Sequence, residues 1–379
     1  MVTYWVFTLN IFWDKLVMRP SLVNQDKFGI TVPMYIIDLL NLYSLLDRNM
    51  YFYFITPVFI VLNKNKLNIS LRHYTDNKNK LVYSYLAGLI EGDGHLNVPK
   101  GLKTSSLAPY LRREFLRNTS GGGEGKTISA KIEIIFALKD APSAEYLKSM
   151  FGGNIYRIPN KNCVKWIIQD KKSVTFIVNC INGKLRTPKI STLYKLIDFL
   201  NEKGDNIQKF PLDSSPLESN AWLAGFIDAD GNFAIKGFST GWGSLRTPPH
   251  PLRTYLGFQF YLGQRTIYVN GESLEGVMQN ISDFLKTKLR TRTIRGFDQF
   301  VVNTSSKESN LILVDYLNTY PLMSSKYLDF KCWEKALNFY INKLYKDPKH
   351  LEKIRFLKEN MNISRTEFNW SHHENSIYK

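Results

Sequence analysis

Two apolar segments of the chain end in the same way, at a carboxylate followed by glycine. The first covers 86–94 (LAGLIEGDG) and the second covers 223–231 (LAGFIDADG), 137 residues further along. Each segment predicts an apolar helix that stops at its Asp-Gly pair. Because the interval is about the length of one small domain, the repetition predicts a duplicated structural unit.

Small residues recur at every fourth position of both predicted helices: Ser84, Gly88 and Gly92 in the first, Ala221, Gly225 and Ala229 in the second. Residues four apart lie on one helical face, so each helix carries a smooth stripe. Glycine inside a helix costs up to about 1 kcal/mol relative to alanine. That cost is understandable where two helix backbones must approach closely, so we expect Ser84, Gly88, Ala221 and Gly225 to form a helix–helix interface.

The elements that follow each helix are also repeated. In the first unit the pattern predicts strands at 95–98 and 131–134, a helix at 140–150, a hairpin around 160–162, and helices at 173–182 and 190–200. In the second unit it predicts strands at 232–236 and 252–262, a helix at 274–285, strands at 288–295 and 297–303, and helices from 306 and 326. Strands and helices in this order predict an α+β protein.

The same patterns divide the chain into five parts. They are an N-terminal extension of unknown role (1–80), repeat 1 (81–203), a polar linker (204–218), repeat 2 (219–345) and a charged helical tail (346–379).

The charge of the chain indicates the kind of partner. Lys and Arg number 50 against 33 Asp and Glu, a formal net charge of +17. Such an excess favours a polyanionic partner, although a basic organellar or ribosome-associated protein without a specific site has the same balance. The most apolar run, 50–62, is too short for a bilayer and contains Pro57, and the first thirty residues lack signal-peptide features, so no membrane partner is predicted.

Cysteine usage excludes two further classes of site. Cys163, Cys180 and Cys332 are widely spaced and have no nearby histidine pair. They therefore form neither a disulfide framework nor a zinc site, and we expect free thiols.

Several predicted strands carry one basic, amide-bearing and aromatic face. In 253–262, apolar residues alternate with polar ones, and charged residues alternate in the same way elsewhere. Such a face suits the DNA major groove, where Arg reads guanine and Gln reads adenine; the solvated face of an antiparallel sheet has the same period. The candidate groove residues are Arg253, Tyr255, Gln259, Tyr261, Lys288, Arg290, Arg292, Lys131, Arg157 and Lys165.

Close packing of the two apolar helices would bring Asp93 and Asp230 together. Adjacent carboxylates repel each other unless cations lie beside them, and Mg²⁺ accepts a sparse set of carboxylate and carbonyl oxygens completed by water and phosphate. Two such carboxylates could act on one phosphodiester in each strand of a duplex. Two ordinary core helices that end at Asp-Gly turns are the alternative for either copy alone.

The two segments resemble the signature of the LAGLIDADG homing endonucleases in their two-repeat, single-chain form. The resemblance covers roughly 81–345 and extends to 182–189 (NGKLRTPK) and 320–327 (YPLMSSKY), which resemble the segments that close each repeat. It implies two pseudo-symmetric αββαββα units, a two-helix interface, and saddle-shaped antiparallel sheets in the major groove. It also implies a monomer that binds a long pseudo-palindromic site in double-stranded DNA.

The resemblance assigns roles to particular residues. Asp93 and Asp230 correspond to the catalytic, metal-binding carboxylates, and the carbonyls of Gly92 and Ala229 to additional metal ligands. Lys189 and Lys326 correspond to the active-site base of the family, with a phosphate contact at a helix start as the alternative for Lys189.

The resemblance also assigns a role to an amide side chain. Gln264 resembles the residue that orders metal-bound water, and Leu138 or Lys139 is expected at that place in repeat 1.

The function implied by the resemblance is site-specific, Mg²⁺-dependent cleavage of double-stranded DNA that promotes intron homing. One phosphodiester would be hydrolysed on each strand across the minor groove, in a mitochondrion or another organelle. The alternative is an RNA maturase that assists splicing of its own intron, alone or as a second activity. A DNA-binding regulator without cleavage is a third possibility.

Overall fold

The computed structural model describes residues 81–99, 129–237 and 256–378. These ranges fall within one compact unit, Tyr74–Lys379. The predicted extension 1–80 and the candidate groove residues Arg253 and Tyr255 lie outside the described residues. Among the helices of the described ranges, none has the length and apolar character needed to cross a bilayer.

Repeat 1 begins with the helix 81–93, and a four-stranded antiparallel sheet follows in the order β1-β2-β4-β3. Its further elements are β1 (Gly94–Asn97), β2 (Lys131–Ala137), α5 (Ala141–Phe151), β3 (Asn154–Arg157), β4 (Cys163–Ile168), α6 (Lys171–Ile181) and α7 (Ile190–Glu202). Local chemistry sets several ends: α5 has Pro142 in its first turn and stops at Gly152, whose φ is +76°. The side chain of Asp170 caps α6 by accepting a hydrogen bond from Ser173 N.

Repeat 2 has the same order of elements and the sheet order β5-β6-β8-β7. Its elements are α8 (Trp222–Asp230), β5 (Gly231–Lys236), β6 (Gly257–Arg265), α9 (Glu275–Phe284), β7 (Arg290–Ile294), β8 (Phe297–Thr304), α10 (Lys307–Thr319) and α11 (Lys326–Ile341). Both repeats therefore have the predicted αββαββα order, each followed by one more helix, and the fold class is confirmed. The strand predicted at 288–295 begins two residues later than expected.

One face of each sheet packs on the helices and the other faces outward. On β6 the inner residues Phe258, Phe260 and Leu262 are buried, as is Leu256 just before the strand. The ring centre of Phe260 lies 5.4 Å from that of Phe233 on β5, and the ring centre of Phe258 lies 6.3 Å from that of Trp333 on α11. This alternation follows from the two-residue period of a strand.

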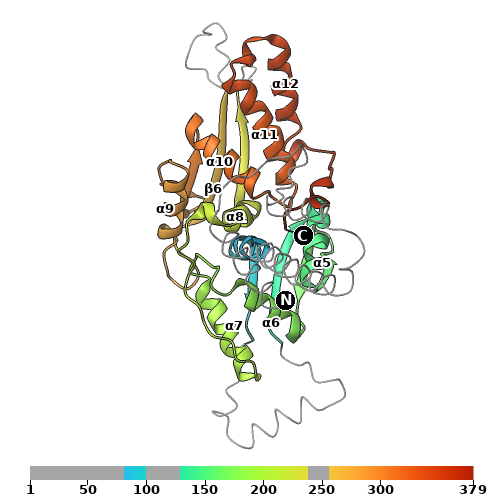
Figure 1. Ribbon diagram of the computed structural model, residues 1–379, viewed down its shortest axis with the longest axis vertical. Helices are drawn as coiled ribbons and strands as arrows, with labels where there is room; N and C mark the ends of the chain where they lie inside the picture. Colours follow the sequence, from blue (N-terminus) through green and yellow to red (C-terminus); the bar gives the residue numbers. More distant parts are fainter. Residues whose placement is uncertain (1–80, 100–128, 238–255, 379) are drawn as a thin grey trace, which may run out of the picture. The chain divides into compact units, whose positions relative to one another are not determined.

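The helix 81–93 and α8 lie side by side in the centre of the molecule (Figure 1). A Cβ added at Gly88 would lie 2.0 Å from the carbonyl oxygen of Trp222, and one at Gly225 would lie 1.9 Å from that of Tyr85. Since no side chain fits in that space, the two backbones touch along the small-residue stripes. Ser84 and Ala221 are buried beside them.

The linker and the tail are both anchored to the repeats. Arg186 binds the linker through the carboxylate of Asp213 at 2.9 Å and the carbonyl of Ser215 at 2.6 Å. The tail is helical over α12 (Pro348–Glu359) and then continues as loop with 3-10 turns at Asn362–Ser364 and Ser371–His373. Its last described residue, Tyr378, is buried and donates a hydrogen bond to the carbonyl of Pro321.

Candidate active site

Asp93 and Asp230 are the last residues of the two central helices, and a strand starts directly after each. The two helix ends meet: a Cβ added at Gly92 would lie 2.2 Å from the Ala229 Cβ and 2.9 Å from Asp230 Oδ2. Although Asp93 is exposed, the atoms packed around its carboxyl and the negative charge of Asp230 raise its pKa to about 6. The fold therefore brings the two predicted carboxylates together at one place.

A lysine lies against the end of each helix. Lys189 Nζ donates to the carbonyls of Ile90, Glu91 and Gly94 at 2.7–2.8 Å. Lys326 Nζ donates to the carbonyls of Ile227, Asp228 and Ala229 at 3.2, 2.6 and 2.7 Å. Three acceptors satisfy an ammonium group fully, and a cation complements the negative end of a helix. Both predicted lysines thus occupy equivalent positions.

Burial affects the pKa of both lysines. It lowers the pKa of Lys189 to about 8 and also lowers the pKa of Lys326, while the carboxylates of Asp93 and Asp230 oppose both changes. Lys189 is 6% exposed, so its ammonium group lies buried among the carbonyl groups at the end of the helix. This location supports a role at the acidic centre over the alternative of a phosphate contact at a helix start.

Gln264 contacts Asp230 directly. Its Nε2 donates to Asp230 Oδ2 at 2.6 Å, which fixes the orientation of the carboxylate. The register of the strands identifies the counterpart in repeat 1: Gly231 pairs with Leu262 and Gly94 pairs with Ile134. The residue equivalent to Gln264 is therefore Phe136, and the expectation of Leu138 or Lys139 is wrong. Phe136 is buried and cannot form a hydrogen bond through its side chain, so the two centres differ.

The donors at the helix ends suit a hard divalent cation. Two carboxylates are present, and the carbonyl of Ala229 keeps a second lone pair beside its bond to Lys326. The described part of the chain has no group of three or more His, Cys, Asp or Glu side chains that could hold a metal. A sparse set of this kind fits Mg²⁺, which retains water and substrate ligands.

Two further acids, Glu91 and Asp228, lie two residues before Asp93 and Asp230 and are each 6% exposed. Glu91 accepts hydrogen bonds from the backbone N–H groups of Arg186 and Thr187. Burial nonetheless raises the pKa of Glu91. Asp228 accepts from Met323 N at 2.6 Å and Ser324 N at 3.2 Å.

Sequence reasoning gave these two acids no structural role. Their positions in the two segments, also 137 residues apart, are the signal that could have identified them.

Most candidate groove residues lie on the outer faces of the sheets. In repeat 2, Gln259 and Tyr261 lie on the outer face of β6, and Arg290 and Arg292 lie on the same face of β7; Lys288 is exposed just before β7.

In repeat 1, Lys131 and Lys165 lie on the outer face, and Lys165 is 3.6 Å from Glu133. Arg157 is placed differently, because it pairs with the buried Val164 and its side chain leaves on the helix side of the sheet. Tyr156, opposite Lys165, takes the outer position there, so the placement expected for Arg157 is wrong.

Comparison with known proteins agrees with this geometry. The model of the LAGLIDADG endonuclease family matches twice, over residues 86–200 and 223–337. The intron-encoded DNA endonuclease aI3 of Saccharomyces cerevisiae is 31% identical over 323 residues, which are 77% of this chain and 72% of that protein. The intron-encoded RNA maturase bI4 of the same yeast is 27% identical over 176 residues, 45% of this chain and 23% of that protein.

A solved structure shares the fold. Meganuclease I-SmaMI bound to uncleavable DNA superposes with a TM-score of 0.52 at 19% identity, over 75% of this chain and 99% of that chain. The duplicated segments match one family model, and the arrangement of the two sheets has its counterpart in this solved structure. The chain belongs to the LAGLIDADG endonuclease family, in its two-repeat form.

Proposed function

We propose that this endonuclease cuts both strands of a specific DNA site in a reaction that depends on Mg²⁺. The observation that carries the proposal is the meeting of Asp93 and Asp230 at the ends of two touching helices. Two centres so close together can act on two phosphodiesters only if these lie close to each other. Opposite strands of a duplex approach in this way across the minor groove.

Each group of residues in the proposed centre has a different chemical role. Asp93, Asp230 and the carbonyls of Gly92 and Ala229 would hold Mg²⁺, which would supply a Lewis acid and lower the pKa of the attacking water. Lys189 and Lys326 hold positive charge beside the carboxylates, where it stabilises the negative charge that develops on the phosphate. Gln264 keeps the Asp230 carboxylate in one orientation.

The outer faces of the two sheets are the proposed DNA interface. Arg290 and Arg292 are exposed on β7, and Gln259 and Tyr261 lie on the same face of β6, which β8 separates from β7. Because Arg and Gln can each bind a base edge with two hydrogen bonds, such a face can read sequence in the major groove. A monomer with two similar sheets would match a long, nearly palindromic site.

The names of the relatives support a role in intron homing. The yeast protein aI3 is described as intron-encoded, and a protein of Schizosaccharomyces pombe that is 27% identical over 259 residues is named for a cox1 intron. We infer that this chain acts in a mitochondrion or another organelle and promotes the movement of the intron that encodes it.

Cleavage selection from a randomised duplex library in Mg²⁺ would test the proposal and identify the site. Asp93→Asn and Asp230→Asn should each abolish double-strand cleavage of the selected duplex. Asp198→Asn, which removes an exposed acid paired with Lys209, is the matched control and should cut normally. Full activity in either active-site variant would contradict the proposal, as would binding without scission at any Mg²⁺ concentration.

A maturase activity is the second candidate, because one relative is named an RNA maturase. The double variant Asp93→Asn, Asp230→Asn separates the two activities. Unchanged splicing of the host intron by this variant would show an RNA function independent of the nuclease centre. If the wild-type protein does not alter splicing, the maturase candidate is excluded.

A further inference from the structure

The loops that carry the two active-site lysines are held by side chains of the opposite repeat. We define the first lysine loop as residues 185–189 and the second lysine loop as residues 322–326. Each loop lies beside a buried acid of its own repeat, Glu91 or Asp228, which accepts two of its backbone N–H groups. Other contacts come from side chains of the loop itself, from the linker and from the tail, and a further set crosses the helix interface.

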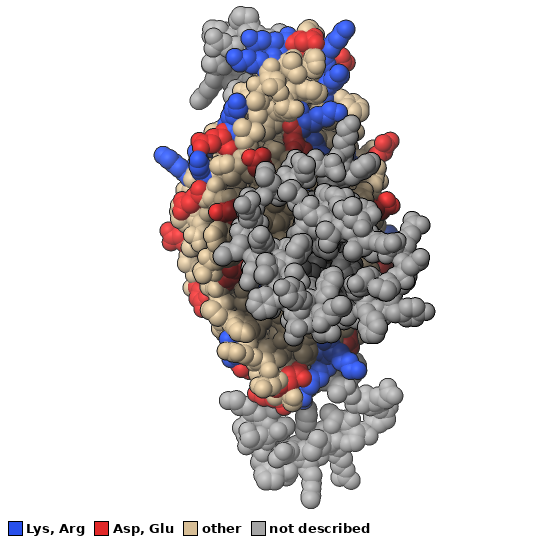
Figure 2. Space-filling view, in the orientation of Figure 1, with Lys and Arg blue, Asp and Glu red and all other residues tan. Residues whose placement is uncertain are grey.

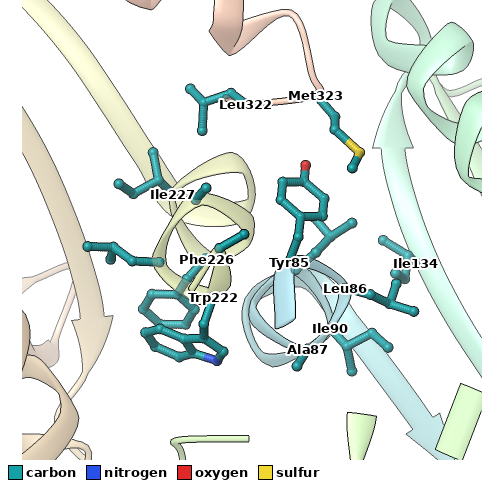
Figure 3. Packing of buried hydrophobic residues seen from close by; sticks show 14 of the residues in the cluster. Tyr85, Leu86, Ala87, Ile90, Ile134, Trp222, Phe226, Ile227, Leu322 and Met323 are labelled. Atoms are coloured by element: carbon teal, nitrogen blue, oxygen red, sulfur yellow. The ribbon is translucent and has the colours of Figure 1, made fainter. Parts of the chain in front are cut away.

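Three side chains of repeat 1 hold the second lysine loop. Tyr85 donates its hydroxyl to the Asp228 carboxylate, and Figure 3 shows its ring leaving the first helix toward Leu322 and Met323. Asp140 Oδ1 accepts from Ser325 N at 2.7 Å, and Ser143 Oγ donates to the carbonyl of Met323 at 2.9 Å. Two of these hydrogen bonds connect repeat 1 to Ser325 and Met323 of the loop. The third, from Tyr85, acts through Asp228, which accepts from Met323 N and Ser324 N.

The reverse arrangement holds the first lysine loop. Trp222 of repeat 2 donates its indole N–H to Glu91 Oε2 at 2.5 Å. Trp222 and Tyr85 occupy equivalent positions 137 residues apart in the sequence. The two crossed contacts are therefore related by the pseudo-symmetry of the repeats, although the donor is an indole N–H in one and a hydroxyl in the other. Asn270 of repeat 2 adds an exposed contact to the Ser191 hydroxyl just after the loop, at 3.0 Å.

The position of each ammonium group depends on its loop. Lys189 and Lys326 reach their three carbonyls only if the loop backbone stays beside the helix end. Hydrogen bonds to buried carboxylates are strong, and a buried acid that loses a donor is left partly unsatisfied. Removal of a crossed contact should therefore move the lysine of the other repeat more than the lysine of its own.

We propose that Tyr85 and Asp140 are positioning residues for the Lys326 centre, and that Trp222 is a positioning residue for the Lys189 centre. This inference rests on the proposed nuclease function for its effect on cleavage. Each strand of the target is then cut by a centre whose lysine is positioned by the other half of the protein. Neither half can be altered at these residues without slowing the cut made by its partner.

Strand-resolved kinetics provide the first test. Each strand carries a different fluorophore, and Lys189→Met and Lys326→Met identify the strand that each lysine serves. Tyr85→Phe and Asp140→Ala should slow the strand served by Lys326 by about tenfold, the size expected for a hydrogen bond to a charged group. Trp222→Phe should slow the other strand. Asp140→Asn should restore the rate, because its amide oxygen can still accept from Ser325 N.

Two control variants remove equivalent hydrogen bonds elsewhere in repeat 1. Trp166→Phe loses an indole bond to the carbonyl of Gly152, and Tyr194→Phe loses a hydroxyl bond to the carbonyl of Phe210. Both should change the two strand rates equally, if at all. All variants are compared well below their own melting temperatures, so that the folded protein is measured.

A second measurement needs neither DNA nor metal. The acylation rates of Lys189 and Lys326 by an amine-reactive ester are followed by peptide mass spectrometry. Tyr85→Phe and Asp140→Ala should accelerate labelling of Lys326 alone, and Trp222→Phe should accelerate labelling of Lys189 alone. This crossed pattern in a protein that cuts no DNA would support the inference while the proposed function fails.

The opposite outcomes overturn the inference. It fails if labelling changes in the repeat that carries the substitution, if both lysines respond equally, or if neither responds. In a protein that cuts DNA, it also fails if these variants leave the ratio of the two strand rates unchanged.

Discussion

At the scale of single residues, the two centres are similar without being identical. Asp93 and Asp230 end equivalent helices. Two of the three carbonyls that Lys189 and Lys326 contact are equivalent, whereas the third is that of Gly94 in repeat 1 and of Ala229 in repeat 2. Among the described residues, an amide partner is present at Asp230 alone, because the strand register puts Phe136 where repeat 2 has Gln264. The two helix ends therefore differ in one specific side-chain contact.

The raised pKa of Asp93 makes a prediction about stability. A carboxyl whose pKa is higher in the folded protein, here about 6 against 3.8, destabilises the fold when it is charged. This cost is present above pH 6 and disappears as the pH falls from 6 toward 4. Asp93→Asn should therefore raise the melting temperature of the metal-free protein at pH 8, and the gain should shrink below pH 6.

Asp170→Asn is the control with the opposite sign. Its hydrogen bond from Ser173 N lowers the pKa of Asp170, so the charged form stabilises the fold above its ordinary pKa, and this contribution is lost in acid. The substitution should lower the melting temperature at neutral pH, with an effect that fades toward pH 3. A pH-independent gain for Asp93→Asn would contradict the prediction.

Gln264→Leu should act on one strand. Loss of the 2.6 Å hydrogen bond frees the Asp230 carboxylate, so we expect about tenfold slower cutting of the strand served by that centre. The other strand should keep its rate. Phe136→Leu is the matched control in repeat 1, since its side chain forms no hydrogen bond to Asp93, and the ratio of the two rates measured on a doubly labelled duplex should be unchanged.

At the scale of elements, local patterns predicted most of the fold. The repeated segments, the small-residue stripes and the two-residue period of β6 indicated helices and strands close to their observed bounds. The errors came from pairing: the register of β3 turns Arg157 to the helix side, and the register of β2 selects Phe136. Strand register cannot be read directly from the sequence, because it depends on contacts between segments that are distant in the chain.

The close packing of the two helices predicts that substitution by alanine changes stability in opposite directions at two glycines. Gly225→Ala would place a Cβ 1.9 Å from the carbonyl of Tyr85, so the helices must separate, at a cost of about 1–3 kcal/mol. Gly276→Ala, on the exposed face of α9 with open space around it, should stabilise the protein by up to about 1 kcal/mol. Urea denaturation measures both, and equal effects would contradict the close approach.

At the scale of the whole molecule, the contacts of the tail with the two repeats could not be predicted from its charge. Basic residues are frequent in α12, and Figure 2 shows Lys and Arg side chains around it at the top of the view. Beyond α12 the chain contacts both repeats: His373 stacks on Tyr146 of repeat 1 and contacts the carbonyl of Met323 of repeat 2. These contacts join residues far apart in sequence and follow no periodic pattern, so only the folded structure reveals them.

The tail should therefore stabilise both repeats together. Tyr378 is buried, its ring centre lies 5.2 Å from that of Tyr85, and its hydroxyl donates to the carbonyl of Pro321. Tyr378→Ala should lower the free energy of unfolding by about 3–5 kcal/mol, as expected for a large buried ring. Ile363→Ser removes an apolar side chain from the same tail that is fully exposed, and it should change the stability by less than about 0.5 kcal/mol.

Denaturation followed by two probes tests whether this stabilisation is shared. Trp166 lies in the core of repeat 1 and Trp333 in that of repeat 2, so single-tryptophan fluorescence can report on each repeat. If the tail joins the repeats, Tyr378→Ala should shift both transitions to lower urea concentration by similar amounts. A shift confined to repeat 2, which directly precedes the tail in the chain, would show that the tail stabilises that repeat alone.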